Sequence, residues 1–600
     1  MQERGVRAAG GATGGGPGRR AVCGGALAAL GLRWGGVAVA DGSTGPVPAD
    51  GGGPVLRHGP AREAGLLPGQ VEAMVADAER FLAPSPDHPW YAGAVLLAGR
   101  GGTVALHRAI GDAVRYAAYD ETTGRGVELP PEQRVPMRPD TVCDVASLTK
   151  LFTSVLAVQS AERGELELEG RVAARLPWFG ARGKAAITVR QLLTHTSGLR
   201  AWLPLYREPD REARLGRLGE EAPQDPPGTA YRYSDLNLIV LQLLLEEVTG
   251  RPLDVLLRQR ITGPLGLRRT RFAPPASWRP WTAATEDARP PWSGLDRGMV
   301  RGEVHDENAY AWGGVAGHAG VFSRAWDVAV LARALLNGGG YGRARIMAPA
   351  SAELLFRNFN VAFPGDAHGL GFELNQRWYM GAMAGPETAG HTGFTGTSVV
   401  LDRHSDTFLV LLGNSVHPVR TWRSGSAPRV AVADRLARAV PVRPPSGRTA
   451  WCAGLPAGSG PVATLTLPVP AADGPGLRLR CALWWDTEPG AERLLLEAAQ
   501  AGRWRAVPFT AVRPGGVRGG QPDGEVAGWS GRAWHAVDAA LPAGARRLRW
   551  RYTRAGRLRG RGVYVDGLRV VGGGERVLFD DIRPGDTARI AADGWTRSAN

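Results

Sequence analysis

A segment rich in proline, glycine and serine, residues 441–460, divides the 600-residue chain into two parts of different character. Before it, from Asp144 to about Ala439, helical periodicity alternates with short strand-like runs. After it come short β-like runs separated by turn residues, and these runs are Thr464–Leu467, Leu477–Trp485, Arg493–Ala498, Arg547–Tyr552 and Gly562–Val571. The pattern predicts a domain of mixed helices and strands followed by a β-sandwich.

The amino-terminal residues have the features of an export signal. Arg19-Arg20 precede a short, weakly apolar stretch, and Ala38-Val39-Ala40 has the A-x-A form of a cleavage site. The paired arginines and the mild hydrophobicity are typical of a twin-arginine signal, so we expect the protein to be secreted or delivered to the cell wall by that route. Arg33 and Trp34 interrupt the usual spacing and leave the cleavage site open. A disordered, glycine-rich leader is the alternative.

These patterns divide the chain into five segments. The segments are an export signal at 1–40, a Gly/Pro-rich linker at 41–64, a mixed domain at 65–440, a second linker at 441–460 and a β-sandwich accessory domain at 461–600. No run in the sequence approaches the ~18–20 apolar residues that a membrane-spanning helix needs. We therefore expect no transmembrane segment.

The positive charge of the chain comes almost wholly from arginine. The formal net charge of +15 would suit an anionic partner such as nucleic acid, a membrane surface or an anionic wall polymer. The abundance of arginine, alanine and glycine together favours a genome-wide codon bias instead, so no nucleic-acid partner is expected. The lysines of the sequence are Lys150 and Lys184. Because arginine does not release its proton, Lys150 is the first candidate for a site that needs a neutral amine.

Lys150 lies three residues after Ser147, at the start of a segment with helical periodicity that runs to about Arg163. Residues i and i+3 share a helix face, so the Ser147 hydroxyl and the Lys150 amine can come within hydrogen-bond distance. The start of a helix places N–H groups beside the nucleophile, and a desolvated lysine can act as its base. For this short motif taken alone, a solvated helix start is the alternative.

Two further motifs follow along the chain. Tyr233-Ser234-Asp235 precedes an apolar helix from Leu236 to Val248, and a phenol beside an ammonium could share the role of base. His391-Thr392-Gly393-Phe394 precedes a strand-like run from Thr397 to Leu401, and a Gly-rich strand offers N–H donors to a substrate carbonyl. Taken singly, the tyrosine would be a packing residue at a helix start, and the second motif a strand with a turn.

The three motifs in this order resemble the signatures S-x-x-K, Y-x-N and K-T-G of the serine β-lactamase and penicillin-binding-protein superfamily, nearest its class C and esterase-like branches. The supporting stretches are Ile187–Leu199, Pro227–Thr229 and Gly317–Ser323. The resemblance covers about residues 65–440. It implies an α/β (α+β) β-lactamase-like fold, in which helices cover an antiparallel sheet and a helical subdomain lies beside it.

The resemblance also implies a role for each motif residue. Ser147 would be the nucleophile that forms an acyl-enzyme, and Lys150 and Tyr233 would handle the proton. The backbone N–H groups of Ser147 and Phe394 would form the oxyanion hole. The residues that would line the substrate-binding strand are His391, Thr392 and Gly393.

Two positions depart from the family pattern. Asp235 stands where many relatives have asparagine and cannot donate an amide hydrogen when ionised, although Asn237 could compensate as a substrate-binding residue. His391 stands where the lactamases have lysine, and a histidine is largely neutral at physiological pH. We therefore expect weak β-lactamase activity. Esterase-like and peptidase-like relatives tolerate such a histidine.

Two stretches resemble a branch of cell-wall-recycling relatives that includes muropeptide amidases and penicillin-binding carboxypeptidases. They are Gly302–Ala309 and Gly413–Pro418. In this interpretation His305 and Asp306 form a rim that recognises an amide or a sugar. A His–Asp pair that anchors a loop is the alternative.

The motifs of other enzyme classes do not occur in the sequence. It has no G-x-S-x-G at Ser147, no G-x-x-x-x-G-K-[ST], no H-E-x-x-H and no His or Cys cluster at zinc spacing, so no cofactor and no metal is expected. The leading hypothesis is an exported serine hydrolase that acts through an acyl-enzyme on an amide or ester, with a cell-wall peptide or muropeptide as its substrate (D,D-carboxypeptidase or amidase type). The alternatives are a carboxylesterase of the same fold and a non-catalytic wall-binding or sensing protein.

The C-terminal sandwich resembles jelly-roll modules appended to secreted peptidases. The residues that carry this resemblance are Trp484-Trp485-Asp486, Gly528–Gly531 and Gly562–Asp566. Exposed tryptophans could bind wall glycan, and the arginines near Arg546–Arg561 could bind an anionic wall polymer. Equally, the tryptophans could be core residues and the arginines a solvated face. A calcium ion could also bind such a sandwich.

Three cysteines would remain after cleavage of the leader. In an oxidising compartment Cys452 and Cys481 could pair. Cys143, just before the Ser147 helix, is expected to be a small core residue rather than a nucleophile.

Overall fold

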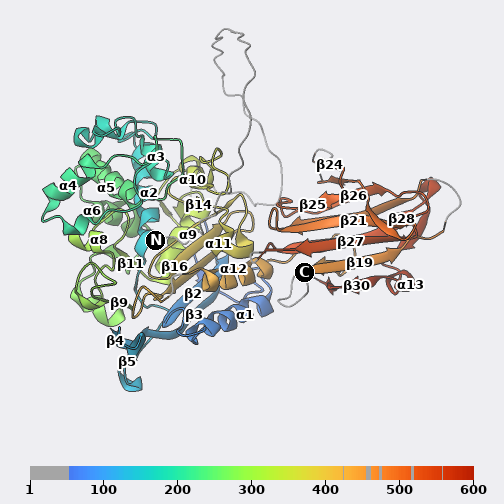
Figure 1. The fold of residues 1–600 in the computed structure, drawn as a ribbon, viewed down its shortest axis with the longest axis horizontal. Helices are drawn as coiled ribbons and strands as arrows, with labels where there is room; N and C mark the ends of the chain where they lie inside the picture. The colour runs from blue at the N-terminus through green and yellow to red at the C-terminus, as the bar shows by residue number, and fades with distance from the viewer. Residues whose placement is uncertain are drawn as a thin grey trace, which may run out of the picture. The chain divides into compact units, whose positions relative to one another are not determined.

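Helix α12 (Ala427–Ala439) ends a domain of mixed helices and strands, and strand β18 (Ala450–Ala453) begins an all-β domain (Figure 1). The computed structural model describes residues 53–599 except 423–424, 455–460, 472–475, 515, 517–518 and 557–558. The predicted export signal and most of the first predicted linker lie outside these residues. The predicted fold class, a β-lactamase-like α/β domain followed by an all-β domain, is confirmed.

An eight-stranded sheet forms the frame of the first domain. Its order along the sheet is β1 (Arg57–His58), β3 (Thr103–Val114), β2 (Gly93–Arg100), β17 (Thr407–Gly413), β16 (Thr397–Asp402), β15 (Thr388–Thr392) and β14 (Glu373–Leu374), with β6 (Val135–Pro136) on β3. β1 pairs in parallel and the other neighbours are antiparallel. The strand-like runs Ala92–Ala98 and Thr103–His107 on either side of Gly101-Gly102 predict a hairpin. This hairpin is present as β2 and β3.

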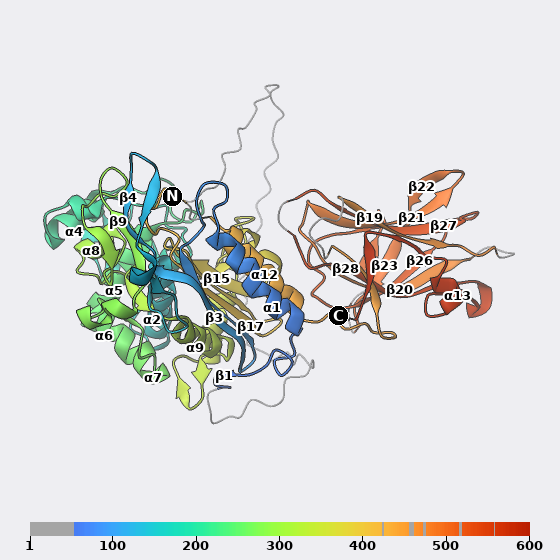
Figure 2. The ribbon, with the colours of Figure 1, turned by 90° about the horizontal axis from the view of Figure 1, so that it is seen from below.

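Side chains that alternate along the strands supply two separate cores, because successive residues of a strand point to opposite faces. On one face, Val95 and Leu97 of β2 pack in the core that includes α2 (Thr149–Glu162) and α9 (Ala325–Leu336). On the other face, Leu96 packs with α1 (Pro68–Glu79) and α12. Figure 2 shows α1 and α12 side by side over the strands.

Helix α2 lies at the centre of the first domain, and its residues from Thr149 to Ser160 are all buried. It packs against α5 (Asp235–Thr249) and α6 (Leu253–Leu257). The other helices are α3 (Val189–Leu193), α4 (Arg211–Glu220), α7 (Gly263–Leu265), α8 (Glu307–Ala311), α10 (Pro349–Phe356) and α11 (Arg377–Met380). In the described part of the chain no helix has the length and apolar character to cross a membrane.

The remaining strands of the first domain are short and form separate small sheets outside the eight-stranded sheet. They are β4 (Tyr116–Asp120), β5 (Arg125–Glu128), β7 (Cys143–Asp144), β8 (Arg271–Phe272), β9 (Ala284–Ala288), β10 (Gly298–Arg301), β11 (Val321–Ser323), β12 (Gly340–Tyr341) and β13 (Ala344–Arg345). β11 pairs with β7, and this pairing fixes the backbone just before Ser147.

The all-β domain consists of two sheets. One has the order β24 (Gly519–Gln521), β23 (Phe509–Val512), β26 (His535–Ala540), β20 (Arg478–Asp486), β28 (Gly562–Val571), β18 and β31 (Trp595–Ser598), with β29 (Val577–Asp580) on β28. The other has the order β22 (Arg503–Ala506), β21 (Glu492–Gln500), β27 (Arg547–Arg554), β19 (Val462–Pro468) and β30 (Ala591–Asp593), with β25 (Glu525–Val526) on β21. A short helix, α13 (Pro584–Thr587), follows β29.

Most of the tryptophans that the sequence singled out in this domain are core residues, but Trp529 of the Gly528–Gly531 stretch is half-buried, with the Arg532 guanidinium carbon 4.7 Å from its ring centroid. Trp484 and Trp485 are buried, and Trp550 is fully enclosed between the sheets. The basic face of β27 is occupied by ion pairs, since the Nε atoms of Arg549 and Arg551 lie 2.7 and 2.9 Å from the Glu497 carboxylate. These residues therefore match the alternative in which the tryptophans are core residues and the arginines form a solvated face. A wall-polymer partner stays a prediction.

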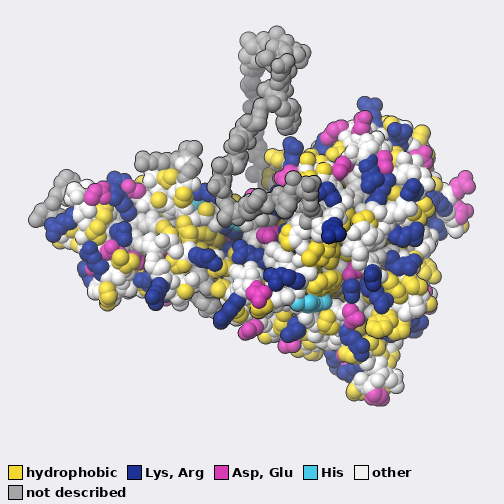
Figure 3. Space-filling view, turned by 180° about the vertical axis from the view of Figure 1, so that it is seen from behind, with side chains coloured by type: hydrophobic (Ala, Val, Ile, Leu, Met, Phe, Trp, Pro, Cys, Tyr) yellow, Lys and Arg dark blue, Asp and Glu magenta, His cyan; other side chains and the backbone are white. Residues whose placement is uncertain are grey.

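On the one face of the molecule that Figure 3 shows, basic side chains do not form a single patch. On the face shown in Figure 3, Lys and Arg side chains are interspersed with acidic and apolar ones. Such mixing lowers the local field that a charged polymer would experience.

Two details differ from the sequence-based expectations. β1 and β18 lie inside the segments expected to be linkers, and each is paired in a sheet. The described cysteines are free and buried. Cys452 packs with Trp484 and Tyr564 on one face of its sheet, whereas Cys481 belongs to the core between the sheets, so the two thiols lie on different faces. Cys143 is a core residue, as predicted.

Replacing Trp550 with alanine should lower the free energy of unfolding of the sandwich by about 3–5 kcal/mol, because it empties a fully enclosed site. Urea unfolding followed by circular dichroism measures the change. Ile582→Ala, at a side chain that is 57% exposed in the same domain, is the matched control and should change it by less than about 0.5 kcal/mol. Equal effects of the two substitutions would contradict the core assignment.

Candidate active site

The Ser147 hydroxyl and the Lys150 amine meet as the helical spacing predicts. Lys150 Nζ donates to Ser147 Oγ over 2.9 Å and to the carbonyl of His318 over 3.1 Å. Its third oxygen neighbour is Asp235 Oδ1, at 2.7 Å. Lys150 is only 1% exposed, so its ammonium is held by oxygen contacts rather than by water. The Ser-Lys motif and the Tyr-Ser-Asp motif therefore form one site.

The backbone that presents Ser147 is under local strain. Ala146, which precedes the nucleophile, has φ of +47°, a conformation that residues with a side chain seldom adopt. The buried Asp144 carboxylate holds this turn, because it accepts the Ala146 N–H over 2.8 Å and the His305 N–H over 2.6 Å. Asp144 thus links the nucleophile to the His305 loop.

Tyr233 lies directly over the Lys150 amine, with Nζ 5.0 Å from the ring centroid. Removal from water and the nearby Asp235 carboxylate raise the pKa of Tyr233 well above its usual range, although its hydrogen bond with Ser147 acts in the opposite direction. Tyr233 is therefore a neutral phenol in this resting site. In this state Tyr233 can donate a proton. This differs from the sequence-based expectation that Tyr233 is deprotonated beside the Lys150 ammonium and shares the role of base.

His195 positions the segment that carries Tyr233. Its Nδ1 accepts the Ser234 N–H over 3.1 Å and lies 3.0 Å from Asn237 Nδ2, while Ser197 Oγ donates to Asn237 Oδ1 over 2.6 Å. Both polar atoms of the Asn237 amide are thus engaged, and the side chain is fully buried. Asn237 therefore does not compensate at the substrate for Asp235; it fastens α5 to the His195 turn.

The third motif lies at the end of β15, beside the nucleophile. Thr395 Oγ1 donates to the Asp144 carbonyl over 2.8 Å, and Thr397 Oγ1 donates to the Val145 carbonyl over 3.0 Å. A Cβ on Gly393 would lie 2.5 Å from the Val145 carbonyl oxygen, so only glycine permits this approach. The approach brings Thr392 and the N–H of Phe394 to the Ser147 segment.

His391 is neutral in this environment. Burial, and secondarily the Lys150 charge, lower the pKa of His391 to about 3. Its Nδ1 lies 2.7 Å from the Thr392 carbonyl, and its Nε2 has no hydrogen-bond partner among the described residues. The ring centroids of His391 and Tyr233 are 5.9 Å apart. His391 therefore offers the site a neutral nitrogen rather than a cation.

His305 and Asp306 anchor a loop rather than form an open rim. His305 is buried, with Nε2 2.8 Å from the Glu286 carboxylate, and its ring stacks on Phe394 at 5.7 Å between centroids. Asp306 Oδ1 lies 2.9 Å from His318 Nε2, and the His318 carbonyl holds Lys150. His305 thus supports the Phe394 ring, and Asp306 holds His318, whose carbonyl binds Lys150.

Sequence reasoning did not assign roles to His195, His318, Glu286 or Arg420. The two histidines lie within the stretches that carry the family resemblance, so their position was a usable signal. Glu286 lies in strand β9 and Arg420 in a turn, and neither belongs to a motif; Arg420 Nη2 lies 2.6 Å from Glu286 Oε2. In the described chain no group of three or more His, Cys, Asp or Glu side chains is arranged to hold a metal ion.

The family model described as Beta-lactamase matches residues 78–433. The chain belongs to the beta-lactamase family. A protein of Escherichia coli (strain K12) named "Putative D-alanyl-D-alanine carboxypeptidase" is 34% identical over 316 residues, which are 48% of this chain and 72% of that one. A protein of the same name from Escherichia coli O157:H7 is 30% identical over 394 residues, 61% of this chain and 86% of that one.

Among solved structures, a penicillin-binding-protein homologue from Caulobacter crescentus is 22% identical, with a TM-score of 0.48, and covers 61% of this chain and 97% of its own. Family membership and the assembled Ser147, Lys150 and Tyr233 make the chain a serine hydrolase of the beta-lactamase and penicillin-binding-protein type.

His391→Gln should make the beta-lactamase-family domain less sensitive to mild acid. The folded protein keeps His391 neutral down to about pH 3, whereas the unfolded chain binds a proton below about 6.5. Wild-type stability therefore falls as the pH drops from 7 to about 5, by about 2 kcal/mol from this residue alone. The glutamine variant should lack that loss, as urea unfolding at both pH values can measure.

His58→Gln, at an exposed histidine, is the control and should keep the wild-type pH dependence. Identical slopes for the wild type and His391→Gln would show that His391 is protonated in the folded site.

Proposed function

We propose that the protein is an exported serine hydrolase, which forms an acyl-enzyme on Ser147 and cleaves an amide or ester in a cell-wall peptide or muropeptide. The observation that carries the proposal is the contact of Ser147 Oγ with a buried Lys150 that is itself paired with Asp235. The names of the two relatives, which are D-alanyl-D-alanine carboxypeptidases by description, support a substrate from the cell wall. The twin-arginine-like leader supports export.

Acylation begins when Ser147 Oγ bonds to the substrate carbonyl carbon. The Ser147 proton passes to Lys150 as Lys150 transfers one of its own protons to the Asp235 carboxylate, 2.7 Å away. Lys150 therefore remains an ammonium, and its charge stabilises the oxygen that attacks. The Tyr233 phenol donates its proton to the leaving amine or alkoxide and recovers one from the Lys150–Asp235 pair.

The carbonyl oxygen becomes an oxyanion during this step. The N–H groups of Ser147 and Phe394 receive it, because the threonine hydroxyls of the β15 turn draw Phe394 against the nucleophile segment. Water then attacks the acyl carbon in the second step, with the same groups moving protons in the reverse direction. Ser147 is released with the carboxylic acid product.

A carboxylesterase is the second candidate, and His391 is the observation that favours it. The pKa of His391 is lowered to about 3, so this position supplies no cation for a substrate carboxylate. A neutral ester would not need that cation. The same absence of charge makes strong turnover of β-lactams unexpected.

A fluorophosphonate probe tests the nucleophile. Intact-mass measurement of the purified protein should reveal one adduct, because the probe traps a serine whose hydroxyl is activated. Ser147→Ala should show none. Ser154→Ala, at a buried serine about two turns further on in α2, is the matched control and should label like the wild type. An unlabelled, folded wild type would overturn the proposal. Labelling justifies assays on esters, D-Ala-D-Ala peptides and muropeptides.

Asp235→Asn tests the proton path. The substitution keeps the shape of the side chain and removes the carboxylate that accepts a proton from Lys150, so the Ser147 proton has no acceptor unless Lys150 is first neutral. The rising limb of the pH–rate profile for p-nitrophenyl butyrate should therefore move to higher pH, and the rate at pH 7 should fall by about 100-fold. Asp77→Asn is the control. It breaks the ion pair between Asp77 of α1 and Arg435 of α12, and it should leave the pH–rate profile unchanged. An unchanged pH–rate profile in Asp235→Asn would show that Asp235 does not accept the proton.

A further inference from the structure

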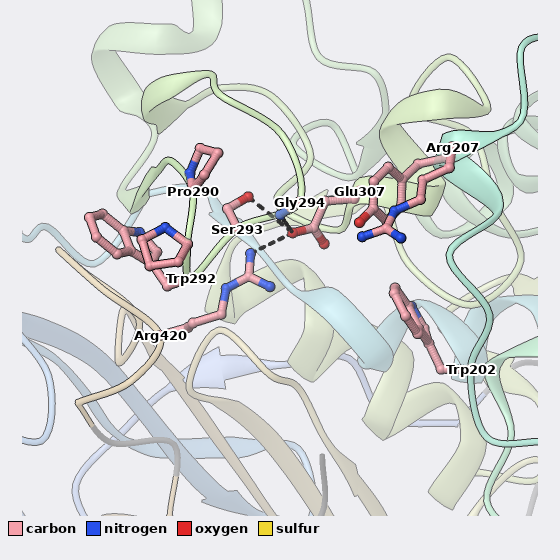
Figure 4. A pocket seen from close by; sticks show the side chains of 10 residues that line it. Trp202, Arg207, Pro290, Trp292, Ser293, Gly294, Glu307 and Arg420 are labelled. Atoms are coloured by element: carbon pink, nitrogen blue, oxygen red, sulfur yellow. Dashed lines mark hydrogen bonds and ion pairs between the residues drawn. The ribbon is translucent and has the colours of Figure 1, made fainter.

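A cavity of about 470 Å³ opens beside the catalytic residues and has no role in the chemistry above (Figure 4). Trp202 and Arg207 stand on one side of it, Trp292 and Pro290 on the other, and Glu307 and Arg420 lie between them. The size suits one ring of a ligand with its substituents.

Both sides of the cavity connect to the catalytic site through single contacts. Trp202 follows Ala201, whose carbonyl accepts the Asp235 N–H over 2.9 Å. On the opposite side, the Arg420 guanidinium carbon lies 6.0 Å from the centroid of the Phe394 ring. These contacts place the two sides of the cavity beside the segments that carry Asp235 and Phe394.

The walls are aromatic and held in place. Trp202 is 41% exposed, which is high for a large apolar side chain, and its ring lies 6.2 Å from that of Tyr206. Trp292 Nε1 donates to the Asp287 carbonyl over 2.7 Å, so its indole is fixed. A Cβ on Gly294 would lie only 2.0 Å from Tyr206 Oη, so the glycine is what allows Tyr206 to sit there.

The floor is polar but nearly balanced in charge. Arg420 Nη2 lies 2.7 Å from Glu307 Oε1 and 2.6 Å from Glu286 Oε2, so two carboxylates neutralise this guanidinium. Ser293 Oγ donates to Glu307 Oε1 over 3.1 Å. Arg207 lies over the Tyr206 ring, with its guanidinium carbon 5.7 Å from the centroid, and has no ion-pair partner among the described residues.

These walls and this floor suit a sugar better than an apolar group or a compact anion. An apolar ligand would take water away from the charged floor and offer it no hydrogen bonds, and a compact anion would find only Arg207 unpaired, because Arg420 already faces two carboxylates. A pyranose ring has C–H faces that pack on indole rings and hydroxyls that can bond to Glu307 and Ser293. Arg207 is then available to donate hydrogen bonds to the oxygen atoms of the ring substituents, such as an acetamido carbonyl.

We propose that this cavity binds the sugar ring of the substrate, so that the scissile amide or ester lies close to a glycan. The inference rests on the proposed function and narrows it, because it favours a muropeptide over a sugar-free peptide. Trp202 and Gly294 are specificity-determining residues in this arrangement, Trp202 by stacking and Gly294 by keeping Tyr206 in position.

Two probes with the same acyl amide test the inference. N-acetylmuramyl-L-alanine carries the sugar, and D-lactyl-L-alanine is the same amide without it. Binding of each to the full-length Ser147→Ala protein is measured by isothermal titration calorimetry, which avoids turnover. We expect the sugar-bearing probe to bind about tenfold more tightly or better, the order of one aromatic contact with its hydrogen bonds.

The variants locate the contact. Trp202→Ala in the Ser147→Ala background should abolish the difference between the two probes, and Gly294→Ala should do the same by displacing Tyr206. Trp281→Ala is the matched control: its side chain is 44% exposed but outside the cavity, so the difference should persist. Melting temperatures confirm that each variant is folded.

The outcomes separate the two proposals. Equal binding of the probes, no binding of either, or an unchanged difference in both Trp202→Ala and Gly294→Ala overturns the sugar site. Fluorophosphonate labelling of Ser147 in the wild type is measured on the same preparation. If Ser147 is labelled but the sugar test fails, the proposed hydrolase activity is retained and only the sugar site is rejected. If Ser147 is not labelled, the proposed hydrolase activity is rejected as well.

Discussion

The buried charge of Lys150 is the constraint on which the site depends. An ammonium that is 1% exposed loses nearly all of its hydration and must be held by oxygen atoms. Three different parts of the chain supply them: the Ser147 hydroxyl on the same helix, the carbonyl of His318 and the carboxylate of Asp235. Removing a partner from such a pair costs about 3–5 kcal/mol, so the fold and the catalytic geometry are stabilised by the same contacts.

The surroundings of the site are built from further buried polar pairs. The Asp144 carboxylate accepts hydrogen bonds from the turn before Ser147 and from the His305 N–H. The His305 ring contacts the Glu286 carboxylate, which is also paired with Arg420 at the cavity. Glu286 is fully enclosed, and its partners lower its pKa to about 2 despite burial. A line of polar contacts thus runs from the turn before Ser147 to the cavity beside Arg420, and each residue in it is held by the next.

The sequence predicts the parts of the structure that depend on local spacing. The Ser147–Lys150 separation, the β2–β3 hairpin and the alternation in β27 all follow from the periodicity of one element. The roles of Asn237 and His305 could not be predicted in this way, because each depends on partners far along the chain, such as His195 and Glu286. The protonation of Tyr233 also depends on burial, which a motif does not specify.

The enclosure of the lysines has a consequence for handling the protein. Lys184 is as buried as Lys150, with Nζ donating to the carbonyls of Gly219 and Glu221, and the sequence has no third lysine. Reagents that acylate amines, such as N-hydroxysuccinimide dyes and crosslinkers, therefore cannot reach either lysine side chain while the domain is folded. Acylation of Lys150 or Lys184 would instead report that the domain has opened.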